Sequence, residues 1–170
     1  MSDKLFTLKS GDCMYENACS FFGHRTINET EELKIRLFKI IERLITEENV
    51  YTFLFGSKSR FNDLCHEIVS QIKEEYPYIK RIYVRAEYPV ISDSYQEYLL
   101  KSYEDTYYPE SIIGSGRSVY VERNCEMINK SQFCIFYYNE DYIPATRKSG
   151  TKIALDYALK HNKKVIVINA

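Results

Sequence analysis

The 170-residue sequence has no tryptophan, only four prolines and six glycines, and almost no net charge, because 23 basic residues oppose 24 acidic ones. A net charge of −1 argues against bulk electrostatic capture of DNA, RNA or an anionic membrane, although it leaves room for a local basic pocket. No apolar run approaches the roughly 20 residues of a membrane-spanning helix, and the first residues lack a signal-peptide core. We therefore expect a cytoplasmic protein with no membrane partner and no bulk binding of nucleic acid.

The five cysteines are scattered and form no CxxC pair, and the three histidines do not cluster with them. A structural zinc site needs clustered cysteine and histidine ligands. An odd number of scattered cysteines instead indicates reduced thiols, most of them buried. We expect neither a metal site nor a cofactor.

What the sequence does contain is a regular alternation of short apolar runs and amphipathic segments. Asn28 or Thr30 is suited to cap the first helix, and Tyr76-Pro77 is suited to end the second. The expected strands cover residues 18–22, 51–55, 79–84, 133–138 and 164–168. Helices are expected after the first two strands, over 94–102, over 119–129 and from 150 or 151 to 161, with loops over 103–116 and 139–149.

Apolar strands that alternate with amphipathic helices indicate a parallel sheet covered on both faces. The predicted fold class is therefore α/β: a Rossmann-like three-layer sandwich with a mainly parallel sheet of about five strands and the first strand at its centre. Residues 1–16 are expected to form an irregular N-terminal lead-in, and residues 17–170 a single domain.

Ligands bind outside the carboxyl ends of the strands in an open parallel sheet, and this rule selects a candidate site. Glycine lets the chain turn sharply after a strand, free N–H groups at a helix N-terminus attract phosphate, and arginine can hold phosphate with two parallel hydrogen bonds. We therefore expect one site for a nucleotide-like small molecule. Its candidate residues are Gly23, His24, Arg25, Gly56, Ser57, Lys58, Glu87, Arg123, Asn139, Ser149, Gly150 and Thr151.

Each charged or polar candidate also has a purely structural explanation. Ser149 can be an ordinary helix cap, Lys58 can belong to a solvated turn, and Arg123 can pair with a neighbouring glutamate on the surface. His24 can be an acid, a base or a hydrogen-bond donor, or only a polar contact. Spacing alone leaves these alternatives open.

Four short motifs follow one another along the chain. They are FGHR at 22–25, FG at 55–56 with Phe61 and Asp63, RN at 123–124 with Met127, and SGT at 149–151 with Ala154, Tyr157 and Ala158. In this order the motifs resemble those of the SLOG superfamily of LOG- and DprA-like Rossmannoid domains, specifically its small YpsA-like branch, over roughly residues 18–169. The resemblance implies a bacterial-type Rossmann-like domain that binds nucleotides or nucleotide-derived ligands, and it leaves a homodimer open because related proteins often dimerise.

The last motif departs from related enzymes at one position. Related phosphoribohydrolases and deoxyribosyltransferases carry a glutamate three residues after the threonine. The resemblance implies that this glutamate takes part in chemistry at the anomeric carbon of the sugar. The corresponding residue here is Ala154. Cleavage of an N-glycosidic bond develops positive charge that a carboxylate must stabilise. Asp156 lies about 200° around the helix from Ala154, so Glu87 is the main reserve carboxylate.

The expected function is therefore nucleotide binding by a sensor-like SLOG-type protein, and not catalysis. One alternative is an N-glycosidic bond hydrolase or transferase that acts on nucleotides. Another is a protein-interaction module with a vestigial pocket.

The alanine at position 154 leads to a first prediction. The protein should release negligible free base from nucleoside monophosphates or NAD-like substrates, because the group that would stabilise the sugar cation is absent. Chromatography of reaction mixtures measures the free base. Clear turnover that disappears in Glu87→Gln would instead favour the enzyme.

Overall fold

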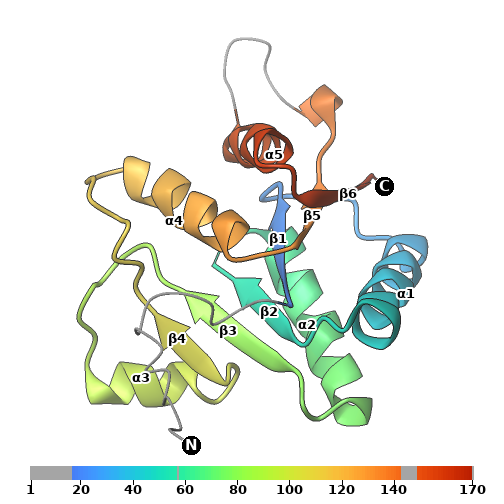
Figure 1. The fold of residues 1–170 in the computed structure, drawn as a ribbon, viewed down its shortest axis with the longest axis horizontal. Coiled ribbons are helices and arrows are strands. Elements are labelled where there is room, and N and C mark those ends of the chain that lie inside the picture. The colour runs from blue at the N-terminus through green and yellow to red at the C-terminus, as the bar shows by residue number, and fades with distance from the viewer. Residues whose placement is uncertain (1–16, 57, 143–148, 170) are drawn as a thin grey trace, which may run out of the picture.

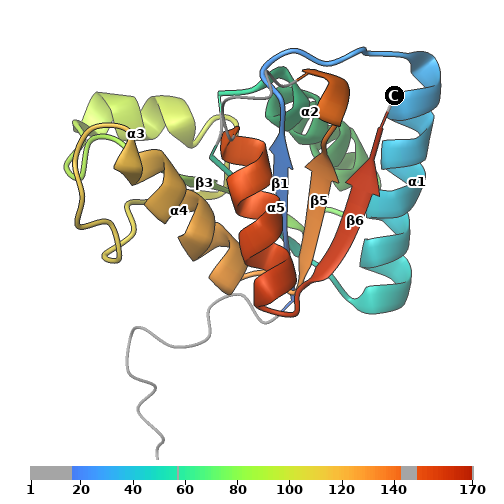
Figure 2. The ribbon, with the colours of Figure 1, turned by 90° about the horizontal axis from the view of Figure 1, so that it is seen from above.

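A computed structural model describes residues 17–56, 58–142 and 149–169, and shows one parallel sheet between two layers of helices (Figures 1 and 2). The strands are β1 (Ala18–Gly23), β2 (Thr52–Phe55), β3 (Lys80–Val84), β4 (Asp105–Tyr107), β5 (Phe133–Tyr137) and β6 (Lys164–Ile168). The helices are α1 (Glu31–Glu48), α2 (Arg60–Glu75), α3 (Asp93–Leu99), α4 (Ser118–Asn129), α5 (Gly150–Lys160) and the 3₁₀ helix η1 (Glu140–Tyr142). The strand order is β4-β3-β2-β1-β5-β6, and all neighbours pair in parallel. The predicted α/β three-layer architecture is confirmed.

Successive residues of the central strands face opposite helical layers. Phe21 and Ile135 pack into the core beneath α1 and α2, whereas Phe22 and Phe136 pack beneath α4 and α5. These four side chains are at most 3% exposed. Because helices cover both faces of the sheet, the sequences of its central strands are continuous apolar runs.

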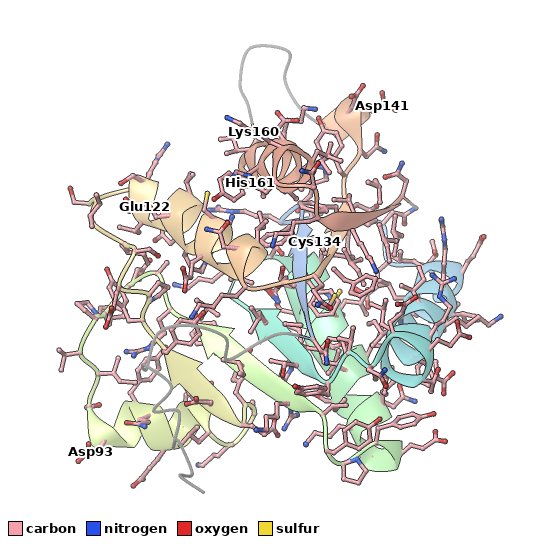
Figure 3. All side chains as sticks on the ribbon, in the orientation of Figure 1. Asp93, Glu122, Cys134, Asp141, Lys160 and His161 are labelled. Atoms are coloured by element: carbon pink, nitrogen blue, oxygen red, sulfur yellow. The ribbon has the colours of Figure 1, made fainter. Side chains whose placement is uncertain are left out.

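Most charged side chains lie at the periphery, as the labelled Asp93, Asp141 and Lys160 illustrate (Figure 3). Cys134 lies on β5 in the interior, where its sulfur is 3.7 Å from the Ser20 hydroxyl. Cys19 and Cys65 are also fully buried, and Cys125 is partly exposed, so most of the described cysteines are buried thiols as expected. Within the described ranges, no group of three metal-ligating side chains occurs and no helix has the length and apolar character to cross a membrane.

The sheet has one strand more than expected. Strand β4 lies within the predicted loop 103–116. It was not predicted because its three residues, Asp-Thr-Tyr at the edge of the sheet, form no apolar run. Part of the predicted loop 139–149 forms η1, and residues 143–148 lie outside the described ranges. The predicted helix over 94–102 ends earlier, at Leu99, and the predicted lead-in 1–16 is also outside the described ranges.

The strand order creates a crevice beside β1. From β1 the chain proceeds through β2 and β3 to β4 on one side, whereas β5 and β6 pair on the other side. The connections that follow β1 and β5 therefore diverge at the carboxyl edge of the sheet. Such a switch point is the usual ligand site of an open parallel sheet.

Gly23 ends β1 against the ring of Phe61 in α2. A Cβ atom at position 23 would lie 2.5 Å from Cβ and Cγ of Phe61. Phe61 is fully buried, and its ring packs in a tilted arrangement against Tyr137 with 5.6 Å between the ring centroids. Only a glycine allows α2 to pack this closely on the end of the strand.

We therefore expect Gly23→Ala to lower the free energy of unfolding by about 1–3 kcal/mol through overpacking. Urea denaturation measures the change. Gly150→Ala is the matched control, because a Cβ atom at position 150 meets no atom within 4 Å. Equal stability of the two variants would contradict the packing role of Gly23.

Candidate functional site

A cavity of about 1280 Å³ opens at the carboxyl edge of the sheet. It is bounded by the segments after β1, β2 and β3 and by the first turns of α4 and α5. The sequence-predicted residues that line it are Gly23, His24, Arg25, Lys58, Glu87, Arg123, Ser149, Gly150 and Thr151. Segments more than 100 residues apart in the sequence thus contribute to one cavity.

Three predicted residues are not among those that line the cavity. Gly56 lies behind the Arg123 side chain, and the Asn139 backbone N–H donates a 3.0 Å hydrogen bond to His24 Nε2. Ser57 lies outside the described ranges. The structure therefore gives Gly56 and Asn139 supporting positions.

Arg123 enters the protein interior from α4. Its side chain is only 5% exposed, Nη1 donates to the Gly56 carbonyl oxygen, and Nε donates to Asn124 Oδ1 at 3.1 Å. A Cβ atom at position 56 would lie 2.7 Å from Arg123 Cδ and 2.9 Å from the Val84 carbonyl oxygen. Glycine at position 56 is thus required for the arginine to pass.

The surface ion pair considered for Arg123 does not form. Glu126 pairs with Lys130 at 3.3 Å, the Glu122 carboxylate accepts the Gly114 N–H, and the ion pairs among the described residues do not include Arg123. Burial lowers the pKa of Arg123 to about 10, which leaves the guanidinium charged at neutral pH. A buried cation of this kind favours an anionic ligand.

The lining of the cavity is strongly basic. One carboxylate, Glu87, lines it among the described residues. The basic side chains that line it are Arg25, Lys58, Arg85, Arg117 and Arg123. Arg60, which belongs to the same connection as Lys58, is instead held outside the cavity by Glu29 and Glu67 at 2.7 Å.

Helix α5 points its N-terminus at the cavity. The Ser149 hydroxyl accepts the Lys152 N–H at 3.1 Å, so this side chain acts as a helix cap. The N–H groups of Gly150 and Thr151 belong to the first turn, whose donors have no intrahelical acceptors. Ala154 is 2% exposed and packs in the core beneath α4 and α5, so even its Cβ does not reach the cavity.

His24 connects the segment after β1 to the segment after β5. Because Nε2 accepts the Asn139 N–H, the ring carries its proton on Nδ1. Burial lowers the pKa of His24 below its ordinary value of 6.5, and the ring nitrogen that accepts the Asn139 N–H must be unprotonated. The neutral ring is therefore part of the folded geometry.

Sequence reasoning missed the aromatic and some of the basic lining. In the part of the chain that the structure describes, four tyrosines line the cavity, namely Tyr83, Tyr88, Tyr95 and Tyr120. With 16 tyrosines spread along the chain, no spacing singles these out. Arg85 carried a usable signal, because it follows β3 directly and lies two residues before Glu87.

The fold and the cavity define a Rossmann-like α/β domain with a basic site at the carboxyl edge of its sheet. No protein-family model matches the chain, and no curated protein matches it. Among solved structures, DNA processing protein A from Helicobacter pylori, described for its single-stranded DNA binding mode, has the same fold, with a TM-score of 0.58 and 15% identity. The match covers 90% of this chain and 65% of that protein, so the present chain spans about two thirds of its length. At this level of identity the similarity shows a shared Rossmann-like fold.

This similarity overturns one expectation from composition. The net charge of −1 led us to expect no bulk nucleic-acid binding, yet a protein with this fold binds single-stranded DNA. Net charge sums over the whole surface, whereas binding depends on the local potential of a cleft. The basic lining described above shows why the sum was misleading.

The lowered pKa of His24 leads to a prediction about stability. Above pH 6.5 the ring is neutral in both the folded and the unfolded state; below it the unfolded state takes up a proton first, so the free energy of unfolding falls. Burial lowers the pKa of His66 as well, and it contributes in the same direction. Denaturation measured from pH 7.5 to 5.5 should show a smaller fall in the free energy of unfolding for His24→Gln than for the unmodified protein. The double variant that also carries His66→Gln should show the smallest fall. An unchanged loss in both variants would contradict these assignments.

Proposed function

We propose that this protein is a SLOG-type binding protein of the YpsA-like branch, a single domain over residues 17–170 that binds a nucleotide or nucleotide-derived ligand in the basic cavity. The observation that carries the proposal is the buried guanidinium of Arg123, which lines the cavity without a carboxylate ion pair among the described residues. A phosphate or other anionic group of the ligand supplies the missing charge. Burial of a charge is costly unless it is paired.

The geometry around Arg123 supports phosphate as the partner. A guanidinium has five N–H donors, and two of them bond the Gly56 carbonyl and the Asn124 side chain. The remaining donors suit the planar, two-point contact that phosphate accepts. The first turn of α5 lines the same cavity and offers the phosphate backbone N–H groups and the positive end of the helix dipole.

Binding accounts for the site better than hydrolysis does. Ala154 packs in the core, and Asp156 pairs with Lys152 at 3.0 Å on the outer side of α5. Glu87 does line the cavity, but its carboxylate accepts a hydrogen bond from Tyr120 and lies 4.0 Å from Lys58. Its carboxylate is therefore already engaged with a hydrogen-bond donor and lies near an ammonium group, which favours a recognition role over a catalytic one.

A second candidate function is binding of single-stranded nucleic acid through the same cavity. It is favoured by the shared fold with DNA processing protein A and by the size of the cavity, about 1280 Å³, which exceeds the roughly 300–1,000 Å³ of ordinary small-molecule pockets. Both candidates need the same phosphate contacts. They differ in whether one nucleotide suffices or a longer strand is required.

A substitution at position 150 can test ligand binding without disturbing the fold. A side chain at Gly150 enters open space, and a negative charge in the first turn of a helix stabilises that helix. Thr151 is less useful because it is 8% exposed and packs against its surroundings. Gly150→Glu therefore keeps the fold and places a negative charge where the phosphate is proposed to bind.

We expect Gly150→Glu to unfold at the same or a higher temperature and to lose about ten-fold or more in affinity for nucleoside monophosphates. A thermal-shift assay with a panel of nucleotides identifies those that bind, because a ligand at 100 times its dissociation constant stabilises the folded protein by about 2.7 kcal/mol. Gly150→Ala is the matched control and should keep both stability and affinity. Equal affinity of the Glu and Ala variants would refute the proposed phosphate position.

The same panel distinguishes the two candidate functions when it includes a single-stranded oligothymidine of about ten nucleotides. Binding of mononucleotides alone supports a small-molecule site. Binding of the oligonucleotide alone, weakened in Gly150→Glu and by added salt, supports the strand-binding function. Mass spectrometry of the denatured protein identifies any nucleotide that is released.

A further inference from the structure

One wall of the cavity is aromatic. Tyr88 follows β3, Tyr95 lies on α3 and Tyr120 lies on α4, and these segments flank β3 and β4 on the side of the sheet away from α1 (Figure 1). Their side chains are respectively 63%, 36% and 39% exposed. Exposed rings gathered in a cavity gain little from packing and are available to a planar ligand.

The backbone at Tyr88 is unfavourable for the residue it carries. Its φ is 60°, in the left-handed region that glycine adopts without cost and a bulky residue rarely does. Arg85 Nη1 holds the turn by donating to the Tyr88 carbonyl oxygen at 2.8 Å. The fold therefore places a ring at the cavity mouth in a conformation that a glycine would occupy more favourably.

Tyr120 is held in a defined orientation by its polar end. Its hydroxyl donates to Glu87 Oε1, which raises the pKa of Tyr120, and the Arg123 guanidinium carbon lies 5.7 Å from the ring centroid. The other Glu87 oxygen, Oε2, lies 4.0 Å from Lys58. One carboxylate thus stands beside an aromatic ring in a cavity that is otherwise basic.

Aromatic rings beside a phosphate site suit a nucleobase. Stacking on tyrosine is open to every base because each base has a π-face. An ionised carboxylate can only accept hydrogen bonds, so it pairs with N–H groups on the edge of a base and not with carbonyl oxygens there. Guanine presents two adjacent N–H donors, at N1 and N2, whereas the single N–H of uracil lies between two carbonyl oxygens that a carboxylate repels.

We propose that the wall formed by Tyr88, Tyr95 and Tyr120 is a nucleobase subsite and that Glu87 selects guanine there. This inference rests on the proposed function, because the base is positioned by a phosphate held near Arg123 and α5. Tyr88 supplies a stacking ring, and its unfavourable backbone serves binding and not stability. Glu87, oriented by the Tyr120 hydroxyl, accepts hydrogen bonds from the edge of the base.

Calorimetry on the full chain with ribose 5-phosphate, GMP and UMP tests the subsite separately from the phosphate contacts. We expect GMP to bind at least about five-fold more tightly than ribose 5-phosphate, from stacking, and at least about five-fold more tightly than UMP, from Glu87. Glu87→Gln should reduce the preference of GMP over UMP and leave ribose 5-phosphate unchanged. If ribose 5-phosphate and GMP bind equally, the base subsite is refuted while the proposed function stands; if neither binds, both fail.

Variants of Tyr88 separate a binding role from a structural one. Tyr88→Gly should unfold at the same or a higher temperature, because glycine relieves the backbone, yet lose about five-fold or more in GMP affinity with no change for ribose 5-phosphate. Tyr88→Phe, which retains the ring, should restore most of the GMP affinity. Tyr78→Ala is the matched control, since Tyr78 is 61% exposed but is not among the residues that line the cavity. A lower unfolding temperature in Tyr88→Gly, or equal loss for both ligands, would overturn the role of this ring.

Discussion

The guanidinium of Arg123 reaches from α4 to the carbonyl oxygen of Gly56 at the end of β2, and the cavity is built around this contact. The hydrogen bond fixes the middle of α4 against the sheet, and the bulk of the side chain separates the cavity from Gly56. The same group brings a positive charge into the interior, where burial lowers its pKa to about 10 without removing the charge. The proposed ligand follows from that charge, because an anion is the partner that the surrounding protein does not supply.

The topology explains why such a contact forms at the carboxyl edge. Strands β1, β2 and β3 all end at this edge because they are parallel, so the segments that follow them begin there. Strand β5 lies on the opposite side of β1 from β2, and this arrangement opens the crevice. His24 then joins the two diverging segments through the Asn139 N–H. A parallel sheet thus gathers polar groups that are distant in the sequence, while its two apolar cores keep their positions fixed.

Charge is distributed unevenly over this molecule. Acidic and basic residues nearly cancel over the whole chain, yet among the described residues the cavity collects five basic side chains and one carboxylate. Some basic residues are neutralised elsewhere, as Arg60 is by Glu29 and Glu67. The local excess of basic side chains gives the cavity a positive potential that the net charge of the whole chain does not reveal.

The sequence by itself determined the layers, five of the six strands and the glycines at the strand ends, because apolar periodicity is a local property and parallel topology sends all carboxyl ends to one edge. It also placed most of the basic candidates at that edge. It could not reveal β4, whose three residues become a strand only by pairing with β3. Nor could it distinguish a surface Arg123 from a buried one, or four tyrosines of the cavity from the other twelve in the chain. Those features were decided by the tertiary structure, because burial and convergence arise from contacts between residues far apart along the chain.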